Sequence, residues 1–185
     1  MGQFENIKSE SLWCRKVDIP SRLPLEGDIE TETAVIGAGI AGLLTAYLLN
    51  KQGRKVIVLE ADRIAGGQTK NTTAKITSQH GMIYSSLMKK IGKDRAKLYA
   101  MANQEAVRLY EKLIIEQEIE CGFRKISSLL YSCREADPLK REAEVSEALG
   151  LKASFTERTE LSFRVEGAVC FEDQAQFEPL AFVKH

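Results

Sequence analysis

Two short apolar runs with an apolar helical segment between them dominate the first third of the chain. The run 34–36 leads into a glycine-rich turn, and the segment 43–48 continues as a mostly apolar helix up to Gly53. A second apolar run, 56–59, ends on the carboxylate of Glu60. Strand-like runs on both sides of a helix-like segment predict a βαβ unit with a parallel strand pair.

The glycine-rich turn has the G-x-G-x-x-G spacing of dinucleotide-binding proteins. The first glycine allows a sharp turn, the second lets the backbone approach a pyrophosphate, and the third lets the helix pack close to the strand. The first N–H groups of the helix and the positive end of its dipole then form an anion site. The turn comprises Gly37, Ala38, Gly39, Ile40, Ala41 and Gly42.

Glu60 lies 18 residues after Gly42, at the predicted carboxyl end of the second strand. A carboxylate in this position can accept hydrogen bonds from both hydroxyls of an adenosine ribose. It would repel the 2′-phosphate of NADP, which Arg63 could otherwise bind. The structural alternative is a buried βαβ unit without a ligand, and it requires the glycines and the acid to coincide by chance. A membrane span is not expected, because the uncharged segment 34–49 has 16 residues and a span needs about 20.

A loop rich in glycine and hydroxyl groups, 65–73, follows the second strand and has too few apolar residues for a regular element. Further along, the pattern predicts a short strand at 76–79, a short helix at 83–91 and a long helix at 93–118. The long helix has one apolar stripe, with spacings of four, four, three and four residues, which we expect to pack in the core. The stripe consists of Leu98, Ala102, Ala106, Leu109 and Leu113.

Beyond Cys121 the apolar runs become short and strand-like, at 129–131 and 168–171. They enclose a charged helix at 138–149, and the segment 176–185 looks like the opening of a helix. The expected fold class is therefore α/β, with a Rossmann-like βαβ unit and part of a second, α+β domain.

We expect three regions along the chain. An N-terminal arm occupies 1–32, the dinucleotide-binding domain 33–120, and the partial α+β substrate domain, which includes the start of a return to the first domain, 121–185. Within the arm, Trp13 is expected to anchor the extended segment by apolar packing.

Composition excludes several classes of partner. The 26 basic and 26 acidic residues balance, so no net charge attracts nucleic acid or anionic lipid. The first ten residues are polar, which makes secretion unexpected and a cytoplasmic location the default. The four cysteines form no C-x-x-C pair, so we expect reduced thiols and no metal site.

Several segments resemble the FAD-dependent oxidoreductases related to D-amino-acid oxidase and glycine oxidase. The similarity is greatest to the bacterial branch that often carries a C-terminal Rieske iron-sulfur domain. The chain lacks the paired Cys-x-His and Cys-x-x-His motifs of such a domain, so no cluster is assigned. The segments that resemble the family are 12–13 with Pro20 and Pro24, 35–42, 58–61, 64–75 and 174–179.

The resemblance implies FAD as the cofactor, with its pyrophosphate on the three glycines of the turn and its ribose on Glu60. It also implies that the loop 66–75 runs along the diphosphate towards the isoalloxazine ring. His80 follows this loop closely enough to lie near the ring, or it is an ordinary hydrogen-bonded histidine. Thr72 and Thr73 either contact the cofactor or cap the loop. Besides the six residues of the turn, the expected cofactor-binding residues are Glu60, Ala61, Gly67, Gln68, Thr69, Thr72, Thr73, Ala74 and His80.

The activity implied by the resemblance is oxidation of a small amine or amino acid, with hydride transfer from the substrate C–N bond to the flavin. Complete family members are much longer, so we expect a truncated, inactive N-terminal part whose catalytic residues are unknown. One alternative is a non-catalytic dinucleotide-binding module, or half of a split enzyme completed at the unpaired sheet edge by itself or by a second chain. Another alternative is an NAD-dependent dehydrogenase, which the same glycine motif permits.

Overall fold

The computed structural model describes residues 10–185 and divides into two compact units. Unit 1 contains the residues up to Ala74, Ile119–Cys121 and Glu178–His185, and unit 2 contains Lys75–Glu118 and Gly122–Phe177. The expected α/β class with an additional α+β part is confirmed. These units are defined by contacts, and the division into FAD-binding and substrate domains stays a prediction.

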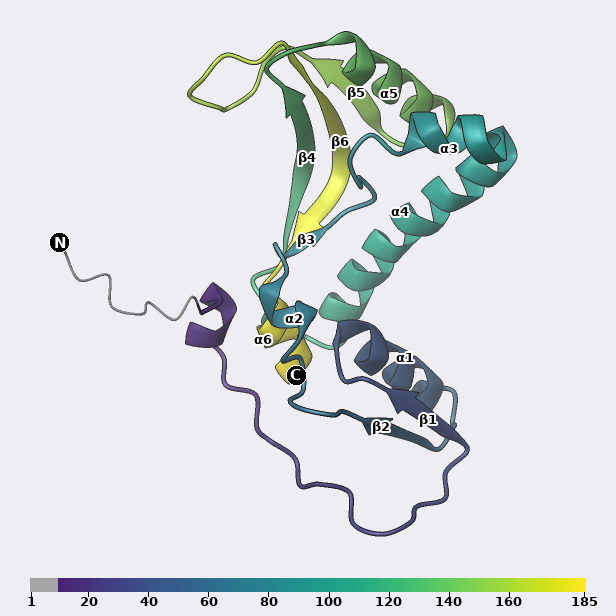
Figure 1. Cartoon of the computed structure of the whole chain (residues 1–185), viewed down its shortest axis with the longest axis vertical. Coiled ribbons are helices and arrows are strands. Elements are labelled where there is room, and N and C mark those ends of the chain that lie inside the picture. Colours follow the sequence, from purple (N-terminus) through teal and green to yellow (C-terminus); the bar gives the residue numbers. More distant parts are fainter. Residues whose placement is uncertain (1–9) are drawn as a thin grey trace, which may run out of the picture. The chain divides into compact units, whose positions relative to one another are not determined.

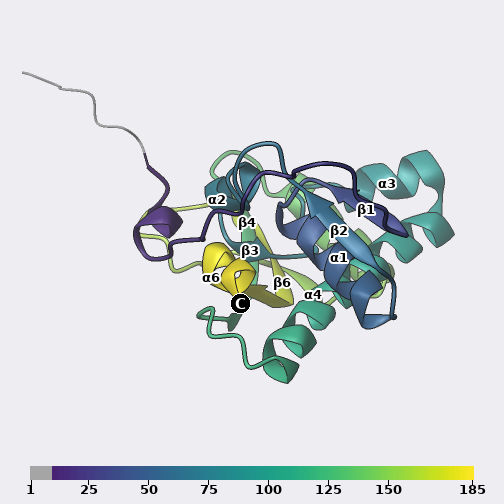
Figure 2. The same cartoon turned by 90° about the horizontal axis from the view of Figure 1, so that it is seen from below.

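Unit 1 is built on a parallel pair of strands that carries one helix (Figures 1 and 2). Thr33 pairs with Val56 and Ile36 with Leu59, and the helix between the strands contacts both of them. Its elements are η1 (Leu12–Arg15), β1 (Thr33–Ile36), α1 (Ile40–Lys51), β2 (Val56–Leu59), α2 (Gln68–Asn71) and α6 (Pro179–Lys184).

Polar contacts hold the described part of the N-terminal arm to the rest of unit 1. Trp13 is half-buried, and its indole Nε1 donates a hydrogen bond to the Thr72 carbonyl at 3.0 Å. The Ser11 hydroxyl donates to the Lys70 carbonyl, and η1 contacts both α2 and α6. The anchoring role expected of Trp13 therefore includes a specific hydrogen bond to the loop after α2.

Unit 2 is an antiparallel sheet with helices on one side (Figure 1). β6 is central, because β4 lies along one edge of it while β3 and β5 pair with different parts of β6. The elements are β3 (Lys75–Ile76), α3 (Tyr84–Ile91), α4 (Lys93–Glu116), β4 (Arg124–Ser132), α5 (Asp137–Ala148), β5 (Ala153–Thr156) and β6 (Gly167–Gln176). The strand expected at 76–79 is thus shorter and begins one residue earlier.

The core of unit 2 forms where the helices meet the sheet. Tyr84 is fully buried and stacks on Phe171 with ring centroids 5.9 Å apart. Its hydroxyl donates to the Ser78 carbonyl at 2.5 Å, so the polar end of this core side chain is satisfied. Leu149 and Val169 lie in the same cluster and are also fully buried.

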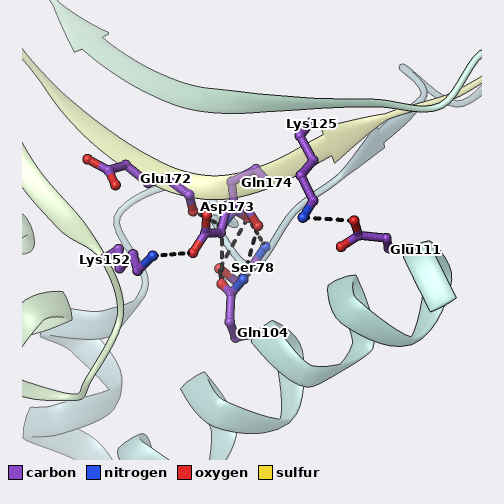
Figure 3. Close-up of polar contacts among 8 residues, drawn as sticks. All are labelled: Ser78, Gln104, Glu111, Lys125, Lys152, Glu172, Asp173 and Gln174. Atoms are coloured by element: carbon purple, nitrogen blue, oxygen red, sulfur yellow. Dashed lines mark hydrogen bonds and ion pairs between the residues drawn. The ribbon is translucent and has the colours of Figure 1, made fainter.

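Two buried glutamines hold β6 where it departs from regular pairing (Figure 3). Asp173 has a φ of 55°, and the register between β4 and β6 shifts at this place. Gln104 of α4 donates through Nε2 to the Asp173 carbonyl at 3.0 Å and accepts from Gln174 Nε2 at 3.1 Å. Gln174 Oε1 in turn accepts from the Ser78 amide at 2.7 Å. The glutamines therefore satisfy the polar groups that the bulge would leave without partners.

The prediction that α4 buries its apolar stripe in the core is wrong. Leu98 is 71% exposed and Leu109 is 54% exposed, and Ala102 and Ala106 are exposed as well. The helix buries a different face, roughly opposite on a helix of about 3.6 residues per turn. That face comprises Ala96, Ala100, Gln104, Val107 and Ile114. Ala96 and Ala100 of this face belong to the core cluster that contains Tyr84 and Phe171, so the more hydrophobic stripe is left outside.

A fully buried carboxylate from another helix caps the start of α3. Glu142 of α5 accepts hydrogen bonds from the amides of Tyr84 at 2.6 Å and Ser85 at 2.9 Å. These amides lie in the first turn of α3, where N–H groups have no partner within the helix. Glu142 therefore supplies the cap that the sequence of α3 does not provide.

We expect Glu142→Gln to destabilise unit 2 by about 1.5–3 kcal/mol, because an amide has one acceptor oxygen where the carboxylate uses two. Urea unfolding followed by circular dichroism measures the change. Glu144→Gln on the exposed side of the same helix is the control and should change the free energy of unfolding by less than about 0.5 kcal/mol. Equal losses in the two variants would contradict the capping role.

Candidate dinucleotide-binding site

The turn between β1 and α1 has the backbone geometry expected of a dinucleotide-binding motif. Gly37 has a φ of 96°, which glycine adopts readily, and its amide donates to the Leu59 carbonyl at 2.7 Å. Gly39 is the N-cap of α1, and its carbonyl accepts the Leu43 amide at 3.0 Å. The first amides of a 12-residue helix therefore lie beside the end of the strand pair.

Gly42 is the residue that lets α1 approach the strand. A Cβ built on Gly42 would lie 1.9 Å from the Gly37 carbonyl oxygen and 3.4 Å from Val35 Cγ1. The first of these contacts is with backbone, which cannot rotate away as a side chain can. The third glycine of the motif is therefore required by packing, as the sequence predicted.

Glu60 lies next to the same turn. Its Oε2 accepts the Ala38 amide at 2.8 Å, and its Oε1 accepts the Asp62 amide at 3.1 Å. The hydrogen bond from Ala38, followed by that from Asp62, lowers the pKa of this exposed carboxyl below its ordinary value. Glu60 is therefore an ionised acceptor at neutral pH, held where the glycine motif and the end of β2 meet.

The loop after β2 was expected to be irregular, and this expectation is wrong in part. It contains the short helix α2, which begins after Gly67. Ala65 precedes it with a φ of 55°, and its amide donates to the Ala38 carbonyl at 2.9 Å. Gly66 has no room for a side chain, since a Cβ would lie 2.9 Å from the Arg63 carbonyl oxygen. Backbone hydrogen bonds and tight turns thus replace the apolar side chains that the loop lacks.

Thr69 connects this loop to the start of α1. It is 7% exposed, and its Oγ1 accepts the Ile40 amide at 3.0 Å. A Cβ on Gly39 would lie 3.4 Å from the same oxygen. The Thr69 hydroxyl keeps a hydrogen that it can donate to an anion beside the helix terminus. Nothing in the sequence predicted this hydrogen bond between Thr69 and Ile40.

The other expected site residues differ in their surroundings. Thr72 Oγ1 accepts the Ala74 amide at 3.3 Å, which is a loop-capping contact, and Ala74 is buried with a φ of 63°. His80 belongs to unit 2, where its Nε2 lies 3.2 Å from Asn103 Oδ1. Among these expected site residues of unit 1, the exposed ones are Ala41, Ala61, Gly67, Gln68, Thr72 and Thr73. Contact of each of these residues with a cofactor stays a prediction.

Unit 2 contains a hollow of about 250 Å³ between α4 and the sheet. Its charged side chains already form ion pairs, with Lys125 Nζ 2.7 Å from Glu111 Oε1 and Lys152 Nζ 2.8 Å from Asp173 Oδ2 (Figure 3).

Among residues 10–185, no helix is long and apolar enough to cross a membrane.

Taken together, unit 1 presents backbone N–H groups, a hydroxyl and an ionised carboxylate around one turn. Such a set binds a phosphate through the helix terminus and a sugar through the carboxylate. Hydride chemistry at such a site would be supplied by a bound cofactor.

We expect Gly42→Ala to destabilise the chain by about 3 kcal/mol or more, because a methyl group would overlap a backbone oxygen. Gly67→Ala is the matched control, since Gly67 has open space around its Cβ position and no positive φ. Thermal unfolding of both variants measures the difference. A Gly42→Ala variant as stable as the control would show that α1 does not need the close approach.

The lowered pKa of Glu60 predicts a pH dependence of stability. The unfolded chain binds this proton more readily than the folded chain, so the contribution of the carboxylate is complete above the unfolded pKa of about 4.5 and is lost as pH falls through the folded pKa. The difference in unfolding midpoint between the wild type and Glu60→Gln should therefore shrink between pH 6 and about pH 3. A difference that stays constant over this range would contradict the contacts of Glu60.

Comparison with known proteins agrees with this geometry. The family model described as DAO, FAD dependent oxidoreductase, matches residues 32–185. YhfW of Bacillus subtilis (strain 168), whose name describes a Rieske 2Fe-2S iron-sulfur protein, is 34% identical over 183 residues. The match covers 98% of this chain and 36% of YhfW, so the chain spans about a third of the length of this relative.

Solved structures of related fold include two amino-acid enzymes. L-amino acid deaminase from Proteus myxofaciens aligns with a TM-score of 0.69 and 17% identity, over 95% of this chain and 38% of that one. Glycine oxidase from Geobacillus kaustophilus aligns with a TM-score of 0.65 and 18% identity, over 83% of this chain and 42% of that one. The resemblance seen in the sequence is confirmed, and the chain belongs to the DAO family of FAD-dependent oxidoreductases.

Proposed function

We propose that this chain binds FAD in unit 1 and serves in an enzyme that oxidises the C–N bond of an amine or amino acid. The observation that carries the proposal is the ionised Glu60 carboxylate beside the glycine turn at the start of α1. The family assignment and the fold shared with a deaminase and a glycine oxidase support the same conclusion. The cytoplasmic location expected from the sequence stays a prediction.

The residues of unit 1 fit FAD. The α1 terminus and the close approach of Gly37 and Gly42 leave backbone N–H groups for a pyrophosphate. Thr69 can donate its hydroxyl hydrogen to the same phosphates, and Glu60 can accept the ribose hydroxyls in place of its present amide donors. The remaining predicted contacts, through Ala61, the segment 67–74 and His80, belong to this proposal.

Bound FAD would supply the hydride acceptor. The chain itself would hold the dinucleotide and fix its orientation, and Glu60 would favour FAD or NAD over NADP by repelling a 2′-phosphate. We assign no catalytic residue. Because the chain spans 36% of YhfW, the activity of a whole protein of this kind, its substrate and its electron acceptor are also proposals.

Two alternative functions would use the same glycine turn. A non-catalytic nucleotide module, or one half of a split enzyme, would use the same turn, and the exposure of Ile36 on β1, at 79%, is consistent with a further strand or chain covering this pair. An NAD-dependent dehydrogenase would also use the glycine turn and Glu60. FAD is favoured because the matching family is FAD-dependent.

The test is retention of flavin by the purified chain. After incubation with excess FAD and removal of free cofactor, we expect the visible absorption bands of bound flavin, together with tighter binding of FAD than of NAD in parallel titrations. Gly39→Val should abolish retention, because its side chain would crowd Thr69 and cover the amides of α1. Ala148→Val on an exposed part of α5 is the control and should bind as the wild type does. A folded chain that retains no flavin would overturn the FAD assignment.

A further inference from the structure

The short helix α2 depends on contacts from outside its own segment. It comprises only Gln68–Asn71, with Thr72 as its C-cap, and a helix of one turn is unstable by itself because nucleation costs more than its few hydrogen bonds contribute. The last carbonyls of a helix also have no partner within it. The carbonyls of Lys70 and Thr72 at the end of α2 therefore need donors from another part of the chain.

The N-terminal arm supplies these donors from one small turn. The Ser11 hydroxyl donates to the Lys70 carbonyl across 59 residues of sequence. Trp13 Nε1 donates to the Thr72 carbonyl at 3.0 Å, across the same separation. The two donors belong together, because Ser11 is the N-cap of η1 and its Oγ accepts the Trp13 amide at 3.4 Å. A single turn of the arm thus binds both carbonyls at the end of α2.

An ion pair also attaches the arm, but it lies at the surface. Lys16 Nζ is 2.7 Å from Oε1 of Glu178, the N-cap residue of α6, and η1 contacts both α2 and α6 (Figure 1). The Lys16 side chain is 54% exposed, and an exposed ion pair contributes little to stability. The hydrogen bonds of Ser11 and Trp13 are therefore the specific contacts through which the arm holds α2.

α2 also contacts the dinucleotide turn, through Thr69. This residue is 7% exposed, and its Oγ1 accepts the amide of Ile40, the first residue of α1, at 3.0 Å. The start of the same loop is held separately, since the Ala65 amide donates to the Ala38 carbonyl at 2.9 Å. Thr69 thus lies between a loop start bound to the turn and a helix end bound to the arm.

We propose that Ser11 and Trp13 are positioning residues for the dinucleotide site, which hold α2 so that the Thr69 hydroxyl stays against the first amide of α1. The inference rests on the FAD site proposed for unit 1, because the pyrophosphate would lie beside that amide. Neither residue has to touch the cofactor. When the arm leaves α2, Thr69 loses its fixed position, so FAD binds only the fraction of molecules in which the arm is docked.

The first experiment measures FAD affinity by titration of flavin fluorescence, using the full chain. The double variant Ser11→Ala, Trp13→Phe removes both donors and keeps an aromatic ring in the arm. Its FAD Kd should rise at least about threefold, because two lost hydrogen bonds shift the docking equilibrium by about tenfold or more. The matched control is Leu12→Ala, Ser21→Ala, which changes exposed side chains of the same arm and should leave the Kd unchanged. Circular dichroism checks that both variants are folded.

The outcomes separate this inference from the FAD assignment. A wild-type chain that binds no FAD would overturn the proposed function. A wild-type chain that binds FAD no more tightly than the folded double variant would overturn the positioning role alone, and so would an equal loss of affinity in the control.

Hydrogen exchange of the chain without cofactor gives a readout that does not depend on FAD. The amides of Ile40 and of the segment 68–72 should exchange faster in the double variant, whereas the amides of β6 in unit 2 should exchange as in the wild type. Unchanged exchange at Ile40, or a uniform increase over both units, would contradict a connection from the arm to the start of α1.

A thermodynamic cycle tests whether the arm acts through Thr69. Thr69→Val removes the hydroxyl and keeps the branched shape of the side chain. In this background the double variant should change the FAD Kd by less than about twofold, because the group that the arm positions is absent. Thr69→Ser retains the hydroxyl and should preserve the full effect of the double variant. A full effect in the Thr69→Val background would show that the arm acts only on general stability and would overturn its positioning role.

Discussion

The close approach of α1 to the end of β1 is the constraint on which the dinucleotide site depends. The backbone of Gly42 meets the carbonyl of Gly37 at a distance that leaves no room for any side chain. This contact fixes the direction of α1, and the direction of α1 determines where its first amides point. Thr69 and Glu60 then bind to amides of the same turn, at Ile40 and Ala38. The site is therefore preorganised by contacts within unit 1 before any ligand is considered.

Unit 2 is stabilised by a different principle, in which buried polar groups satisfy each other. Glu142 caps α3 from another helix, and Gln104 and Gln174 bond to each other and to the backbone around the bulge in β6. A buried polar group without a partner would cost more than an apolar residue of similar size. These side chains therefore specify one packing arrangement of helices and sheet, beyond the stability that the apolar cluster provides.

The long helix shows where sequence reasoning fails. Periodicity correctly predicted a helix over this segment, but it selected the more hydrophobic of two possible faces as the buried one. The structure buries a face of two alanines, a valine, an isoleucine and a glutamine instead, and that glutamine bonds to the backbone of the bulge in β6. A hydrophobic pattern shows that one face of a helix is apolar, but the packing of the other elements decides which face is buried.

The sequence by itself determined the βαβ unit, its glycine turn and its terminal carboxylate, because these depend on local backbone geometry and on residues close together in the chain. It also determined the helices after the loop 65–73, but it did not predict β5 and predicted only parts of β4 and β6. Only the tertiary structure decided which face of α4 is buried, that α2 forms within the loop, and that Thr69 binds the first amide of α1. Each of these depends on contacts between residues far apart in the sequence, which no local pattern records.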